Sequence, residues 1–379
     1  MKKEKKGKWV FFTLLIILGV FLAGCSYNSN QSSEPADKEN EENTPVNDTT
    51  DDVKSNSDII QYYFTANEGG SISKIDASTN EVVKTIEVDG LVHNVQVSPD
   101  GKTVGATVLP AVEHGATHGD SHGEESIEMK GQALFFDIDT DELLKSIDVG
   151  NHPAHIVFTE NGKYVLVTNK EDNNVSVIDT ESYSLIETIE TGIGPHGFRI
   201  TLDSQKAYIA NMGEDTVSVL NLETMKEERK ISVGTTPVTS SITSDGKTLV
   251  TTLNGENMLA IVDLATDQVE AVEVGKGPAQ VYIDGNDKFA YVANQGTEDI
   301  PSNSVSVVEL DSKKLVATIE TGKGAHGVVT STDSKRLYVT NMYENTVTVI
   351  DTGKNEVIDT IKVGKTPNGI SITKRVKND

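Results

Sequence analysis

The chain carries a short repeated motif, seen most clearly as Tyr-Val-Thr-Asn at residues 338–341 followed by Val-Thr-Val-Ile-Asp at residues 347–351. Each run is rich in β-branched residues and ends at Asn or Asp, which is typical of half-buried β-strands. A Gly-Lys-Thr-Pro turn follows at residues 364–367. Together these runs indicate one unit of antiparallel sheet that ends in a tight turn.

The Tyr-Val-x-x-Asn run, which we assign to the second strand of each unit, recurs along the chain. Copies lie at residues 63–67, 165–169, 208–211, 249–254 and 291–294, with a degenerate copy at 104–108. The motif asparagines at positions 169, 211, 254, 294 and 341 are therefore separated by 42, 43, 40 and 47 residues. A period of ~40–45 residues with four short β-runs is typical of a propeller blade. Seven copies predict an all-β, seven-bladed β-propeller.

The two ends of the repeat region are complementary. The region opens with a second-type strand at residues 60–67 and finishes with a first-type strand at residues 369–373. We therefore expect the opening blade to combine three N-terminal strands with one C-terminal strand, which closes the ring and removes exposed sheet edges. The propeller is predicted to span residues 59–379.

The runs at 338–341, 347–351 and 364–367 resemble the YVTN-type β-propeller repeat family, over about residues 59–379. This resemblance implies the propeller fold. It also implies a surface, cell-envelope or binding role, because members of the family share no single chemistry.

The N-terminal segment has the pattern of a processing signal. Five lysines among residues 2–8 precede an apolar stretch at residues 9–22, which is the length of a signal-peptide core and short for a spanning helix. The next residues, Leu22-Ala23-Gly24-Cys25, resemble the lipobox of bacterial lipoproteins. The resemblance implies that residues 1–24 are removed and that Cys25 carries acyl chains such as palmitate.

Residues 26–58 are rich in Ser, Asn, Asp, Glu and Thr and contain almost no apolar residues. Such a composition cannot bury enough apolar surface to fold, so it predicts that residues 25–58 form a disordered acidic linker behind the lipidated cysteine. We therefore expect an extracytoplasmic lipoprotein that is anchored to the cell membrane through its lipid.

Composition excludes several classes of protein. Asp and Glu number 58 against 33 Lys and Arg, a net charge of −25, which speaks against nucleic-acid binding. The single cysteine excludes an internal disulfide, a thiolate zinc cluster and a Cys-x-x-Cys redox motif. No nucleophile elbow, P-loop, dinucleotide fingerprint or His-Glu-x-x-His motif occurs, so an enzyme is not indicated. We expect a monomer.

The eight histidines are expected to lie on one face of the ring. Equivalent positions at the starts of first-type strands carry His93, His196 and His326, and His155 lies one residue later in its strand. The connection before that strand carries His152. An insertion at the second-to-third connection carries His114, His118 and His122. Both kinds of connection leave a blade by the same face, so all eight imidazoles are predicted at one mouth of the central channel.

This donor set predicts binding of a divalent transition metal, Zn²⁺ or Cu²⁺. Imidazole nitrogens and carboxylate oxygens suit these ions better than Ca²⁺, and imidazole is largely neutral at pH 7. The insertion repeats a His-Gly-x-x pattern among carboxylates, and His-rich tracts are a metal-binding signal. The insertion and the turn at residues 150–155 also resemble propeller-fold zinc chaperones, which implies a role in metal delivery.

Other interpretations remain open at this point. Single histidines at strand starts are often packing residues, and a His-rich loop can be low-complexity drift. The acidic insertion at residues 297–300 with Pro301 lies on the same face and would suit an adhesion or interaction propeller that binds an envelope protein. A metal at the channel mouth is also compatible with a propeller lactonase or lyase.

Overall fold

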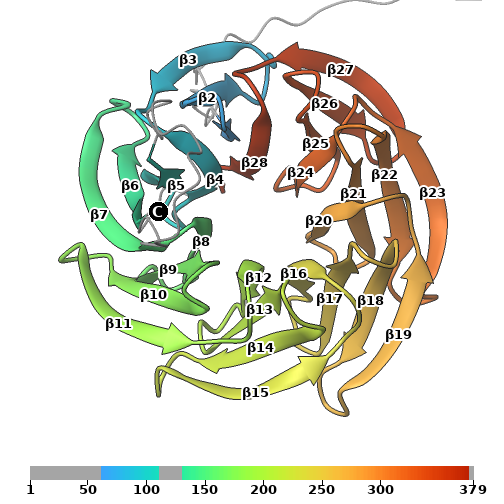
Figure 1. The fold of residues 1–379 in the computed structure, drawn as a ribbon. Helices are drawn as coiled ribbons and strands as arrows, with labels where there is room; N and C mark the ends of the chain where they lie inside the picture. The colour runs from blue at the N-terminus through green and yellow to red at the C-terminus, as the bar shows by residue number, and fades with distance from the viewer. Residues whose placement is uncertain (1–60, 111–129, 375–379) are drawn as a thin grey trace, which may run out of the picture. The chain divides into compact units, whose positions relative to one another are not determined.

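The computed structural model describes residues 61–110 and 130–374, which form a ring of seven four-stranded antiparallel sheets (Figure 1). This confirms the predicted seven-bladed β-propeller. The predicted signal peptide and the whole of the predicted linker lie outside the described residues. Among the described residues there is no helix with the length and apolar character needed to cross a bilayer.

The innermost strands line the central channel (Figure 1), and five of the seven begin with proline. They are β28 (Pro367–Ile372), β4 (Leu91–Val97), β8 (Pro153–Phe158), β12 (Pro195–Ile200), β16 (Pro237–Ile242), β20 (Pro278–Ile283) and β24 (Ala325–Thr330). The second strands carry the Tyr-Val-x-x-Asn motif or a degenerate copy of it: β1 (Tyr62–Asn67), β5 (Thr103–Leu109), β9 (Tyr164–Asn169), β13 (Lys206–Asn211), β17 (Thr248–Leu253), β21 (Phe289–Gly296) and β25 (Arg336–Asn341).

The third strands contain β-branched residues in every blade except that of β6: β2 (Ser71–Asp76), β6 (Lys130–Asp137), β10 (Asn174–Asp179), β14 (Thr216–Asn221), β18 (Met258–Asp263), β22 (Pro301–Glu309) and β26 (Thr346–Asp351). The outermost strands are largely exposed: β3 (Val82–Glu87), β7 (Leu143–Asn151), β11 (Ser184–Glu190), β15 (Lys226–Ser232), β19 (Gln268–Glu273), β23 (Lys314–Glu320) and β27 (Glu356–Lys362).

The ring closes as the sequence predicts, through a sheet in the order β28-β1-β2-β3. Tyr63 faces Ile372 and Thr65 faces Ile370 in the antiparallel pair of β1 and β28. The hydroxyl of Thr373 also accepts the N–H of Tyr62 (3.0 Å). One strand from the C-terminal end therefore completes the first blade.

The apolar core lies between blades. One buried cluster joins Val157 and Leu166 of the third blade to Phe198, Ile209 and Leu220 of the fourth. Because both faces of each middle strand pack against neighbouring sheets, these strands are buried along nearly their whole length. The resulting frame holds the innermost strands around the channel.

The motif asparagine ties the second strand to the third. Asn341 Nδ2 donates to the hydroxyls of Thr346 (2.9 Å) and Thr348 (2.8 Å), and Asn211 makes the same pair of bonds to Thr216 and Ser218. A buried amide needs such acceptors, so the motif has a structural role.

The fifth blade departs from the sequence assignment. The sequence predicts Asn254 at the motif position of this blade, but in the structure Leu253 pairs with Pro237 as Asn211 pairs with Pro195. Asn254 lies one residue beyond the strand, where its Nδ2 donates to the carbonyl of Pro278 (3.1 Å). An apolar residue can therefore occupy the motif position, and the period in this region is more regular than the sequence suggested.

We expect Asn341→Ala to lower the free energy of unfolding by ~1–3 kcal/mol, because it removes two buried hydrogen bonds and leaves the acceptors without their donor. Urea unfolding followed by circular dichroism measures this change. Asn303→Ala is the matched control, since the Asn303 side chain is exposed and donates only to Glu320. Equal effects of the two substitutions would contradict the structural role of the motif.

Candidate metal centre

Three consecutive blades place a histidine at the same mouth of the channel. His93 lies on β4, His155 on β8 and His196 on β12, each within the first three residues of its strand. The strand register explains the offset of His155: its backbone N–H donates to Thr168 Oγ1, as that of Asn94 donates to Thr107 Oγ1. His155 is therefore one position further along its strand than His93.

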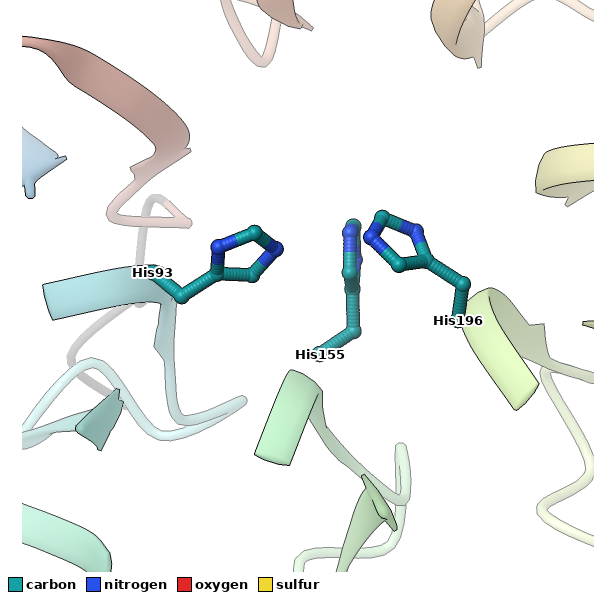
Figure 2. Close-up of side chains that lie close together, drawn as sticks. All are labelled: His93, His155 and His196. Carbon is teal, nitrogen blue, oxygen red and sulfur yellow. The ribbon is translucent and has the colours of Figure 1, made fainter. Parts of the chain in front are cut away.

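The three imidazoles converge (Figure 2). Their ring centroids are 6.2 Å apart for His93 and His155, 5.5 Å for His93 and His196, and 5.0 Å for His155 and His196. One nitrogen from each ring lies within 4.8 Å of the other two. His155 and His196 are buried, and His93 is partly exposed.

Hydrogen bonds fix the tautomers of two of these rings. His93 Nδ1 lies 2.9 Å from Glu68 Oε1, and His196 Nδ1 lies 3.2 Å from the carbonyl oxygen of Val238. Carboxylate and carbonyl oxygens only accept, so both Nδ1 atoms carry the proton. The Nε2 atoms of His93 and His196 therefore keep their lone pairs.

Two imidazole nitrogens at this mouth are buried without a partner. Within the described residues, Nε2 of His93 and Nε2 of His155 accept and donate no hydrogen bond. Buried polar atoms are nearly always paired, so unpaired nitrogens that face one another need a further explanation. A bound cation supplies one.

Electrostatics keep the buried rings neutral. Burial lowers the pKa of His155 well below its ordinary value, and the charges of His196 and His93 lower it further. Burial likewise lowers the pKa of His196, with His93 adding to the effect. Burial acts to raise the pKa of Glu68, but the hydrogen bond and charge of His93 outweigh it and leave that pKa below its usual value.

The Glu68 carboxylate accepts a hydrogen bond from His93 Nδ1 and so orients the imidazole ring. Asn368 Nδ2 donates to the same Oε1 atom (2.7 Å), which fixes the carboxylate in turn. A carboxylate behind a ligating imidazole orients the ring and raises its basicity at metal sites. Glu68 was not among the site residues predicted from the sequence. Its signal was a carboxylate directly after the motif asparagine Asn67, where the other second strands continue with Lys, Met, Asn, Gln or Leu.

The other predicted site histidines are not part of this cluster. His326 occupies the position equivalent to His196, two blades from His93, and its Nδ1 lies 3.3 Å from the Asn368 carbonyl. His152 lies in the turn before β8, with Nδ1 3.3 Å from Glu171. His114, His118 and His122 lie outside the described residues. Their roles as ligands stay predictions.

The three-histidine cluster fits Zn²⁺ or Cu²⁺. Zn–N bonds of ~2.0–2.1 Å in a tetrahedral site place the nitrogens about 3.4 Å apart, so the rings would need to move inward by a modest side-chain adjustment. Three nitrogens leave a fourth position open, as in sites that exchange water or another ligand.

Two family models match the sequence, that of the choice-of-anchor I domain over residues 51–295 and that of the YNCE-like beta-propeller over residues 229–378. No curated protein matches it significantly.

Among solved structures, Kuenenia stuttgartiensis hydrazine synthase matches with a TM-score of 0.61 and 20% identity, over 74% of this chain and 89% of that chain. Dihydro-heme d1 dehydrogenase NirN in complex with DHE matches with a TM-score of 0.59 and 12% identity, over 82% of this chain and 74% of that chain. At these identities the likeness shows the fold alone.

Proposed function

The chain belongs to the choice-of-anchor I domain family, and from the geometry of its channel we propose that it binds a divalent transition metal, Zn²⁺ or Cu²⁺, at the mouth of the propeller. One observation carries the proposal: His93, His155 and His196 from three blades bring nitrogens within 4.8 Å of one another. Two of these rings have a buried Nε2 atom that lacks a hydrogen-bond partner among the described residues.

The placement of the His-rich insertion supports a capture role. β5 ends at Leu109, which pairs with Leu91 at the start of β4, and β6 begins at Lys130, which pairs with Asn151. Both attachment points of residues 111–129 are therefore at the histidine mouth. We propose that His114, His118 and His122 take up the ion and pass it to the channel cluster, with His152 beside the path.

The anchoring of the protein is part of the same proposal. A lipid on Cys25 would keep the propeller outside the cytoplasm as a monomer tethered to the membrane, where a carrier could pass metal to a protein partner. The lipobox, the acidic linker composition and the net charge of −25 support this arrangement. Nucleic acid is not proposed as a partner, because of that negative charge.

Calorimetry on metal-stripped protein tests the proposal. At pH 7.5 we expect about one Zn²⁺ per chain at the channel cluster with a Kd below micromolar. This binding should persist below the ordinary imidazole pKa of about 6.5, because burial holds the pKa of His155 and His196 well below that value. The full chain and a chain without residues 111–129 should both show this site, and the full chain should bind additional ion. Absence of binding heat in both proteins would refute the proposal.

A second function is favoured by a different feature on the same face. The β21–β22 connection carries Glu298, Asp299 and Ile300, and the Ile300 side chain is 69% exposed. An exposed apolar residue beside two acidic ones suits an adhesion or interaction surface that binds an envelope protein. Ile300→Asp should abolish such binding and leave metal affinity unchanged. A lactonase or lyase activity stays a weaker proposal, because it requires a metal-bound water and no described residue defines a substrate.

A further inference from the structure

The channel has a second opening at the other ends of the innermost strands, and a cavity of about 500 Å³ lies there. This volume is in the range of ~300–1,000 Å³ that small-molecule sites occupy. Its lining includes strand residues Gln96, Arg199 and Tyr282 and extends inward to His155 and Gln280. The cavity is therefore continuous with the channel beneath the histidine cluster.

Arg199 lies in the wall of this cavity without an acidic partner. Its Nη1 donates to the carbonyl of Phe198 (3.0 Å), and no carboxylate of the described residues lies within ion-pair distance. Burial lowers its pKa, but an arginine remains charged at neutral pH. Arg199 is only partly exposed, and a charge largely withdrawn from water without a counter-ion is costly, so the guanidinium has unmet capacity for an anion.

The framework does not explain the arginine. Three blades have a polar residue at the equivalent position that accepts a backbone N–H from the neighbouring blade: Gln96 accepts that of Phe158, Ser241 that of Ile283, and Ser371 that of Val97. A guanidinium cannot accept a hydrogen bond. Arg199 therefore cannot join blades in this way.

The acidic residues that line the cavity have other donors. Glu160 pairs with Lys374, Asp284 accepts the backbone N–H groups of Lys288 and Phe289, and Asp287 accepts that of Ser244. All three follow the innermost strands, in the turns at the rim. Arg199 instead lies on β12 itself, and its guanidinium is the charged group that the innermost strands contribute to the lining.

The face of Tyr282 completes the site. The guanidinium carbon of Arg199 lies 5.6 Å from the centroid of its ring, and Val157 and Val329 add apolar wall. We propose that this cavity binds a small organic anion, whose carboxylate or phosphate takes the free N–H groups of Arg199 while its body packs against Tyr282. Planar bidentate pairing with oxyanions is the interaction that arginine makes best.

Titration of metal-stripped protein with benzoate tests this proposal independently of the metal site. Benzamide is the uncharged analogue of the same shape, and inorganic phosphate reports whether an oxyanion alone suffices. We expect benzoate to bind at least about tenfold more tightly than benzamide, as observed by ligand-detected NMR. Arg199→Gln should abolish that preference, and Arg199→Lys should keep part of it.

Arg229→Gln is the matched control, because Arg229 lies on outermost strand β15 and pairs with Asp267. It should leave benzoate binding unchanged, and thermal unfolding should show all variants folded. Binding of phosphate as well as benzoate would assign the affinity to the oxyanion, and binding of benzoate alone would add a contribution from Tyr282. Equal binding of benzoate and benzamide, or unchanged binding by Arg199→Gln, would overturn the proposal.

Discussion

Replacing His155 with alanine is expected to weaken Zn²⁺ binding at the channel cluster by at least about 100-fold. Loss of groups behind a metal ligand typically costs 10–100-fold in affinity, and loss of a ligand itself should exceed that. His155 lies between its two neighbours, with ring centroids 6.2 Å from His93 and 5.0 Å from His196. Its removal leaves two imidazoles and an incomplete coordination sphere.

The measurement is competition of metal-stripped variants against a chromophoric chelator at pH 7.5, with residues 111–129 deleted so that only the channel cluster binds. His326→Ala is the matched control, because His326 occupies the strand position equivalent to that of His196 but bonds to Asn368 and Gln280. It should change affinity by less than about threefold. Equal losses of Zn²⁺ affinity in the two variants would mean that the ion is bound by all four strand-start histidines. No loss of affinity in either variant would exclude the three-histidine cluster.

The fold was predictable because it follows from a repeat. Each Tyr-Val-x-x-Asn copy fixes a strand, its period fixes the number of strands per blade, and the mismatch between the chain ends fixes how the ring closes. These features are local in sequence. The assignment of Asn254 was wrong because Leu253 occupies the motif position at the end of β17 and the asparagine follows one residue later. The spacing of the repeats alone does not distinguish these two positions.

The site was predictable only in part. Strand order places the strand-start histidines at one mouth, but which of them meet depends on side-chain direction. His155 meets His93 and His196 although it lies one residue further along its strand, whereas His326 has the same register as His196 but lies two blades from His93. Glu68 and Arg199 acquire their importance from partners distant in sequence, at Asn368 and Tyr282. No pattern within one blade predicts such pairs.

Mild acid is expected to destabilise the metal-free propeller steeply. His155, His196 and His326 are buried as neutral imidazoles, and burial is the largest cause that lowers each pKa, to about 4 for His326. In the unfolded chain each has the ordinary value of about 6.5. Below that pH the unfolded state takes up protons that the folded state does not, so the free energy of unfolding falls as pH falls.

The expected slope is about 1.4 kcal/mol per pH unit for each such histidine. For His326 this loss extends from pH ~6.5 to the folded pKa of about 4. Glu68 acts at lower pH, because its folded pKa is below its ordinary value and its stabilising effect is lost only as that carboxylate protonates. The histidine effect is therefore separable between pH 5 and 6.5.

Urea unfolding of metal-stripped protein across this range measures the slope. His326→Asn places at this position the residue that the next blade carries as Asn368, and it should reduce the slope by about one histidine's contribution. His152→Gln is the comparison. Burial lowers the pKa of His152 as well, but its side chain is one-third exposed and the charge of Glu171 opposes the shift, so this substitution should reduce the slope by less. A flat profile between pH 5 and 6.5 would show that the imidazoles protonate in the folded protein as readily as in the unfolded chain, which would contradict their burial as neutral rings.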